Sequence, residues 1–293
     1  MLALCLAIGL ASASAGCLAQ TATGAGNSAA TEDTGRLVRE VVYNELHDHA
    51  QHGYFRYWIE RNLPGGTSLE EQVETAAGPV TRTLEWNGRP LQGRQAEQEQ
   101  ARLDQLRDSP TKQAQRRAAF QHDEERIGKI LALLPDAFVY RDEGISDGVR
   151  RLRFTPNPNY TARGVEARVF HCLSGELWID LRTRRMRRLE GHLDQNVEFG
   201  FGLLARVDKG SWFRMVRAPV NATEWKTEQF ELHISGRALM LKTLARNTSE
   251  DRGGFAAVPA RMSLEQGLEF LENPALLRDE AARVAPASFT VKP

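Results

Sequence analysis

The chain has 293 residues, of which 41% are hydrophobic and 26% are charged, a composition typical of a globular protein that can bury a core. Lys and Arg together number 38, and so do Asp and Glu, so the net charge does not indicate a nucleic acid or a strongly acidic partner. Recognition of such a partner would need a local cluster of charges.

The N-terminal residues predict export. Residues 2–10 are apolar and small residues follow them, a pattern typical of a secretory signal peptide and far shorter than the ~20 residues of a membrane-spanning helix. Ordinary cleavage would make residues 1–19 the signal peptide. Cleavage before Cys17, in the sequence Ser14-Ala-Gly-Cys17, would instead leave a lipid anchor on that cysteine. We therefore expect a periplasmic protein, or an outer-membrane lipoprotein if Cys17 is lipidated.

A linker, a helix and several strands are expected next. Residues 20–33 are small, polar and contain Gly, which predicts a flexible linker. A helix from about 34 to 51 is indicated by an apolar stripe at Leu37, Val41, Val42 and Leu46. Aromatic and β-branched residues then predict strands up to a tight turn at Asn87-Gly88. These strands are expected at 54–61, 73–75 and 80–86.

Residues 92–134 interrupt the strands with a helical insert. The segment is rich in Gln, Glu, Arg and Ala, and Ser109-Pro110 divides it into the two helices of a hairpin. The first helix is polar on nearly every side. The second has an apolar end that we expect to dock on a sheet. This end consists of Ile127, Ile130, Leu131 and Leu134.

Strand patterns return after Ala137. Alternation over Val165–Val169 predicts one strand, and Ser235-Gly236 predicts the turn of the last hairpin. Strands joined by turns this short pair antiparallel. We therefore predict an α+β fold, in which residues 34–260 form a single curved antiparallel sheet with helices on its concave face. Residues 261–293 are expected to form a short helix and a loosely held tail.

No pattern predicts an active site. The chain lacks G-x-S-x-G, H-E-x-x-H and C-x-x-C motifs and a Gly-rich phosphate loop before a helix. His49 and His52 would share a helix face but have no third ligand, so a solvated helix end is favoured over a metal site. Cys172 is expected to be a small buried residue. We predict no catalytic residue, no cofactor and no metal.

Two further groups of residues leave alternatives open. Five arginines crowd one predicted hairpin between Arg182 and Arg188 and would either contact phosphate or lipid headgroups or form a solvated rim. The tryptophans lie in or beside predicted strands, where they would either fill a core or line an apolar concavity that receives a ligand. The candidate lining residues are Trp58, Trp178, Phe199, Phe201 and Trp212, with Ile127, Ile130, Leu131 and Leu134 from the insert.

Part of the chain resembles a known superfamily. The segment Gly175-Glu-Leu-Trp178-Ile-Asp180, followed by Thr183 and Met186-Arg-Arg-Leu-Glu-Gly191, is similar to a strand–turn–strand signature of the outer-membrane lipoprotein-sorting superfamily. That superfamily includes the LolA/LolB carriers and RseB-type regulators, and the similarity to a group of its exported bacterial proteins spans about 36–258. Other matching pieces are Val73-Glu-Thr75, Leu133-Leu-Pro-Asp-Ala-Phe138, Phe154-x-Pro-Asn-Pro158, Val197-x-Phe-Gly-Phe-Gly202 and Gly236-Arg-Ala-Leu239.

The resemblance implies a half-open antiparallel β-barrel whose apolar concave face is covered by helices, where the carriers hold acyl chains. No lining residue of the carriers transfers to a position of this chain. The first functional hypothesis is therefore non-enzymatic binding of a lipid or lipoprotein acyl chain in the envelope. The second is an interaction or sensor scaffold, RseB-like, that fills its cavity with its own side chains. An enzyme of unknown type is the third.

Overall fold

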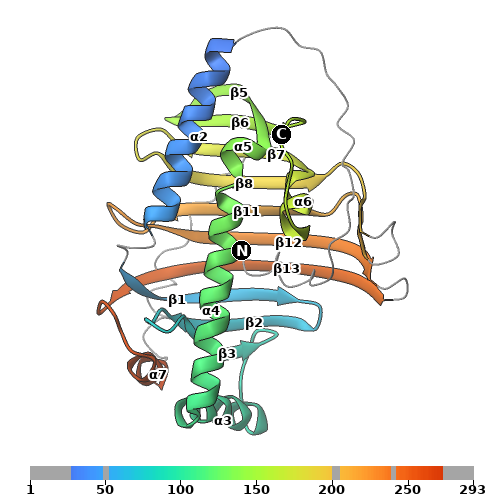
Figure 1. The fold of residues 1–293 in the computed structure, drawn as a ribbon. Helices are drawn as coiled ribbons and strands as arrows, with labels where there is room; N and C mark the ends of the chain where they lie inside the picture. Colours follow the sequence, from blue (N-terminus) through green and yellow to red (C-terminus); the bar gives the residue numbers. More distant parts are fainter. Residues whose placement is uncertain (1–27, 49–52, 200–204, 239–241, 273–293) are drawn as a thin grey trace. The chain divides into compact units, whose positions relative to one another are not determined.

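The computed structural model describes residues 28–48, 53–199, 205–238 and 242–272 (Figure 1). The chain divides into two compact units. Unit 1 is drawn from Met1–His52 and His122–Ser249, and unit 2 from Gly53–Gln121 and Glu250–Pro293. Both are built mainly from antiparallel strands with a few helices, which confirms the α+β class.

Unit 1 is an antiparallel sheet with the strand order β12-β11-β8-β7-β6-β5, and β10 pairs with β12 and β9. Because β5 ends this order, the sheet is open and does not close into a barrel. The strands are β5 (Phe138–Ser146), β6 (Val149–Pro156), β7 (Leu173–Asp180), β8 (Arg185–Leu193), β9 (Val197–Phe199), β10 (Ala205–Val207), β11 (Trp212–Pro219) and β12 (Trp225–Ala238). The helices are α2 (Ser28–Asp48), α5 (Leu134–Ala137), α6 (Val165–His171) and the last turns of α4 (Pro110–Leu131).

Unit 2 has the strand order β4-β3-β2-β1-β13. Its core contains residues of β2, β3, α3 and α7: Val73, Val80, Leu103, Leu106, Met262, Leu268 and Leu271. The strands are β1 (Tyr54–Leu63), β2 (Gly66–Val73), β3 (Val80–Trp86), β4 (Arg89–Pro90) and the later part of β13 (Lys242–Val258). The helices are α3 (Arg94–Asp108), α7 (Leu264–Glu272) and the first turns of α4.

Strict alternation gives the sheet of unit 1 two different faces. Along β7, Leu177 and Ile179 are buried, whereas Glu176 and Trp178 are only partly covered. Leu177 pairs with Leu189 of β8, and directly paired residues lie on the same face. Figure 1 shows α2 lying across the strands of this unit. The apolar face is thus the one under the helices.

Two glycines leave room for aromatic rings to pack on this face. Gly175 and Gly191 are paired across β7 and β8. A Cβ atom at Gly175 would lie 2.0 Å from the carbonyl oxygen of Glu190 and 2.8 Å from the Phe154 ring, and one at Gly191 would lie 2.8 Å from the Phe213 ring. The missing side chains therefore make the space that Phe154 and Phe213 occupy.

Unit 2 buries charged groups within its sheet. Arg56 of β1 forms an ion pair with Glu71 of β2, whose side chain is fully buried. Burial raises the pKa of the Glu71 carboxyl, and the Arg56 guanidinium opposes that rise. Gln72 donates a hydrogen bond to the hydroxyl of Tyr57, whose pKa is also raised by burial. The two faces of this sheet are therefore less distinct than those of unit 1.

Two expectations about strands are wrong. Residues Val165–His171 form helix α6, where Phe170 packs edge-on against Phe138 with ring centroids 5.5 Å apart. A short run of alternating residues fits either element. Ser235-Gly236 is not a turn, because β12 continues through both residues and pairs with β10 there. A Cβ atom at Gly236 would lie 2.2 Å from the carbonyl oxygen of Arg206, so the glycine serves a close strand contact.

The insert at 92–134 has the expected break but serves two cores. The helices α3 and α4 are separated at Ser109. The helix α3 is polar except for a narrow apolar side, where Leu103 and Leu106 are buried in the core of unit 2. The apolar end of α4 belongs instead to the core of unit 1. The helix α2 also begins earlier than expected, at Ser28, so the end of the expected linker is helical.

Candidate functional site

The apolar sheet face of unit 1 is the site where five of the predicted lining residues meet: Ile127, Ile130, Leu131, Leu134 and Phe199. Ile130 and Leu131, at the end of α4, and Leu134 of α5 are buried in its core cluster. Ile127 packs at the margin of this cluster, and Phe199 of β9 is 1% exposed within it. The structure thus brings together the whole apolar end of the insert and one of the predicted aromatic residues.

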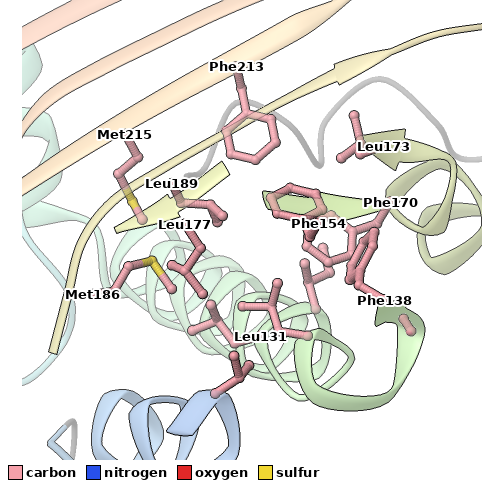
Figure 2. Packing of buried hydrophobic residues seen from close by; sticks show 14 of the residues in the cluster. Leu131, Phe138, Phe154, Phe170, Leu173, Leu177, Met186, Leu189, Phe213 and Met215 are labelled. Atoms are coloured by element: carbon pink, nitrogen blue, oxygen red, sulfur yellow. The ribbon is translucent and has the colours of Figure 1, made fainter. Parts of the chain in front are cut away.

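Aromatic residues that were not among the predicted lining residues form the centre of this site. Figure 2 shows Phe138, Phe154 and Phe170 close together, with Leu131 approaching Leu177 from the helical side. The ring centroids of Phe138 and Phe154 are 4.8 Å apart. A signal was available, because Phe138 alternates with Tyr140 in β5 and Leu152 with Phe154 in β6.

Trp178 lies on the opposite face of the sheet, so the expectation that it lines the apolar face is wrong. Its indole is contacted by two guanidinium groups, with Arg188 at 4.4 Å and Arg151 at 5.6 Å from the ring centroid. Arg151 also pairs with Glu176 at 2.5 Å, and its hydrogen bonds lower the pKa of the Glu176 carboxyl. Trp178 therefore belongs to a charged outer surface.

Two other predicted tryptophans also lie outside this site. Trp212 of β11 is 38% exposed and stacks on His233 with ring centroids 6.3 Å apart, whereas its neighbour Phe213 is in the core. Trp58 lies in β1 of unit 2, close enough to Gly253 that a Cβ atom there would be 2.6 Å from its ring. Among the described residues, no atom accepts a hydrogen bond from its buried indole N–H. Phe201 and Cys17 lie outside the described residues.

A buried carboxylate of α2 forms a hydrogen bond and ion pairs with residues of the sheet. Glu45 is 5% exposed and accepts a hydrogen bond from the backbone N–H of Met186 at 2.9 Å. It also pairs with Arg185 at 3.4 Å and with Arg217. Because α2 also buries Leu37, Val38, Val41 and Val42 in the core of unit 1, it is a fixed part of the cover. Two of the five clustered arginines therefore have partners within the chain. Arg185 pairs with Glu45, and Arg188 lies over the Trp178 ring.

The end of α4 is held by weaker polar contacts. Arg126 pairs with Glu166 of α6 and with Asp123 of its own helix, at 3.8 Å. Lys129 and Glu125, 3.9 Å apart, are both exposed, and exposed ion pairs contribute little. Tyr140 donates a hydrogen bond to the carbonyl oxygen of Leu134 at 2.7 Å. The buried apolar side chains, the Arg126 ion pairs and the Tyr140 hydrogen bond together hold this end of the insert on the sheet.

Other predicted groups are placed as follows. Cys172 is buried, at the end of α6 rather than in a strand. Within the described ranges, no three His, Cys, Asp or Glu side chains are placed to hold a metal ion, and His49 and His52 lie outside those ranges. None of the described helices combines the length and apolarity needed to cross a membrane.

Comparisons with known proteins give little further information. No protein-family model matches the chain. No curated protein matches it either. The crystal structure of a DUF1329 family protein from Desulfovibrio piger aligns with 78% of this chain and 93% of its own, with 11% sequence identity and a TM-score of 0.25. A similarity at that TM-score supports no conclusion about fold or function.

Proposed function

We propose that this chain is an exported, non-enzymatic protein that binds an acyl chain of a lipid or lipoprotein against the apolar sheet face of unit 1. It would work in the periplasm, or at the outer membrane if Cys17 carries a lipid. The proposal includes a relationship to the LolA/LolB/RseB-like superfamily. The observation that carries it is a helix, α4, that is polar along its body and covers the apolar face only with its end.

The energies allow a ligand to replace this cover. Ile127, Ile130, Leu131 and Leu134 contribute at most ~1.5–3 kcal/mol each by burial. An acyl chain gains ~0.8 kcal/mol for each buried CH₂ group, so about ten carbons would match the displaced side chains. The ion pair of Lys129 with Glu125 is exposed and that of Arg126 with Glu166 is partly exposed, so water can replace them, whereas the hydrogen bond from Tyr140 to Leu134 is buried. Opening at α4 is therefore cheaper than opening at α2, which buries Leu37, Val38, Val41 and Val42 in the same core and makes the Glu45 contacts in addition.

Leu131→Asp tests this proposal, because it places a charge between the end of α4 and the apolar sheet face. We expect uptake of a fluorescent fatty acid to rise while far-ultraviolet circular dichroism stays unchanged. Ala132→Asp is the matched control, since Ala132 is the next residue and is exposed; it should change neither signal. Global unfolding of the Leu131 variant would show that the helix end is ordinary core. No change in either signal would show that the helix end does not cover a binding face.

A scaffold that fills its own cavity is the second candidate. It is favoured by the tight packing of the site, where Leu134, Leu152 and Leu177 are fully buried against other side chains of the chain. Lipid extraction and mass spectrometry of protein purified from a bacterial envelope separate the two candidates. Acyl lipid in stoichiometric amount supports binding. Absence of lipid, together with unfolding of Leu131→Asp, supports the scaffold.

A further inference from the structure

Unit 2 contains an open pocket that is separate from the apolar face of unit 1. It has a volume of about 320 Å³ and lies between the β3–β4 hairpin and α3. That volume is at the lower end of the range for small-molecule sites. Its lining combines an aromatic ring with polar side chains, mainly Trp86, Thr83, Gln95, Gln98, Glu99 and Arg102.

An irregularity in β3 brings Trp86 and Thr83 into the same pocket. The two residues are three apart, so regular alternation would place them on opposite faces. Leu69 of β2 pairs with Glu85 of β3, but the next residue, Glu70, pairs with Thr83, so β3 has one extra residue at this bulge. The extra residue shifts the alternation of side chains by one position, which brings Thr83 and Trp86 to the same side. The pocket is therefore built into the strand rather than left by loose packing.

The Trp86 ring is positioned by the turn between β1 and β2. Cβ atoms at Gly65 and Gly66 would lie 3.9 Å and 3.0 Å from the ring, and Gly66 has φ of 140°. A side chain at Gly66 would crowd the ring, whereas one at Gly65 would begin in ordinary contact with it. The indole is thus held in place as one wall of the pocket.

The opposite wall is a polar stripe on α3. Gln95, Gln98, Glu99 and Arg102 follow the spacing i, i+3, i+4, i+7, which places them on one helix face. Arg102 binds both oxygens of Glu99, at 2.7 Å and 2.8 Å. Glu99 accepts a hydrogen bond from the backbone N–H of Thr83 at 2.7 Å, and Arg102 donates one to the carbonyl oxygen of Thr81 at 2.6 Å.

Some polar side chains of the lining are already bonded within the chain, and others are available to bind a ligand. Glu99 and Arg102 neutralise each other and are already bonded to the strand. Within the described part of the chain, the side-chain amides of Gln95 and Gln98 make no hydrogen bond to another residue, and both glutamines are exposed. An amide offers a donor and an acceptor at once. The available chemistry is therefore neutral, with paired donors and acceptors facing an aromatic ring.

We propose that this pocket binds a neutral saccharide. A sugar ring has an apolar face of C–H groups, which would lie on the Trp86 indole, and neighbouring hydroxyl groups that both donate and accept, which would bond to Gln95 and Gln98. The mutual neutralisation of Glu99 and Arg102 disfavours an acidic or a basic sugar. This proposal does not depend on acyl-chain binding in unit 1.

Titration of the full chain with chitotriose and cellotriose, followed by calorimetry and saturation-transfer NMR, tests the proposal. At least one of these neutral oligosaccharides should bind with a dissociation constant near or below the millimolar range, about −4 kcal/mol. Trp86→Ala and the double change Gln95→Ala with Gln98→Ala should each weaken binding tenfold or more. Glucuronic acid and glucosamine should bind more weakly than the neutral sugars.

Two matched variants control for folding and for unspecific contact. Gln105→Ala lies on α3 but outside the pocket lining, and Trp212→Ala removes a half-exposed tryptophan of unit 1; neither should change the affinity. Failure of both oligosaccharides to bind at millimolar concentration would overturn the proposal. So would binding that survives Trp86→Ala in a variant with an unchanged circular dichroism spectrum, or a preference for the acidic sugar.

Discussion

In unit 1, alternation along β7 places Leu177 and Ile179 on one face and Glu176 and Trp178 on the other. In unit 2, β2 buries Glu70, Glu71 and Gln72 in succession. The sheet of unit 1 therefore gains its stability from apolar area removed from water, whereas unit 2 has an apolar core and in addition buries charges that become costly if they lose their partners. Loss of one side chain should consequently affect the two units by different mechanisms.

The largest effect is expected where a buried charge loses its partner. Arg56→Met leaves the fully buried Glu71 carboxylate without its ion pair and should destabilise the protein by ~3–5 kcal/mol. The free energy of unfolding, measured from urea titrations, checks this. The double variant Arg56→Met with Glu71→Leu should recover most of the loss, because it removes both charges. Equal stability of the double and single variants would contradict the role assigned to this pair.

The same variant should be sensitive to pH. Burial holds the pKa of Glu71 above its ordinary value, and loss of Arg56 raises it further. The folded state then binds the proton more tightly than the unfolded state, so this stabilisation is complete below the unfolded pKa and is lost as pH rises through the folded pKa. We expect Arg56→Met to cost more at pH 8 than at pH 5. A loss that is independent of pH would argue against an ionised, unpaired Glu71.

In unit 1 the largest effect should come from an aromatic residue of the apolar face. Phe154 is 1% exposed and its ring occupies the space above Gly175. Phe154→Ala should destabilise by ~3–5 kcal/mol, the range for truncating a buried aromatic side chain. Its cost should be the same at pH 5 and pH 8, because no titrating group is uncovered. A strong pH dependence would show that the two units do not differ as described.

The smallest effect is expected on the outer face of the same sheet. Trp178→Ala removes two cation–π contacts, from Arg151 and Arg188, each worth ~0.5–1 kcal/mol at an exposed site. The loss in urea unfolding should therefore be about 1–2 kcal/mol, well below that of Phe154→Ala. A loss as large as that of Phe154→Ala would place Trp178 in the core and reverse the assignment of the two faces.

The sequence predicts elements better than faces. Proline at position 110 marks the division of the insert, and Asn87-Gly88 marks a turn in which both residues have positive φ. The face of Trp178 could not be derived, because Leu177, Trp178 and Ile179 are all apolar and only one of the two alternating sets faces the core. The register that pairs Trp178 with Arg151 and Arg188 settles the matter, and pairing register depends on contacts far apart in sequence.

The burial of charged residues in unit 2 could not be predicted from the sequence either. The segment Ser68-Leu-Glu-Glu-Gln72 is polar, and polar runs are usually exposed. Within it, Glu71 pairs with Arg56 and Glu70 with Arg61, both of which lie in another strand. The apolar end of the insert, in contrast, could be predicted to dock, because four apolar residues at helical spacing in an otherwise polar helix need cover.

The hydrogen bonds from α3 to β3 also affect whether a second copy of the chain can pair with this strand. Because β4 pairs with β3 only at Glu85 and Trp86, the earlier residues of β3 form a sheet edge. A sheet edge with unpaired backbone groups is a template on which another chain adds as a further strand. The backbone N–H of Thr83 and carbonyl of Thr81 are already occupied by Glu99 and Arg102. A second copy cannot pair at these positions without first displacing side chains that neutralise each other. Removal of Glu99 or Arg102 would therefore be expected to promote aggregation at high protein concentration.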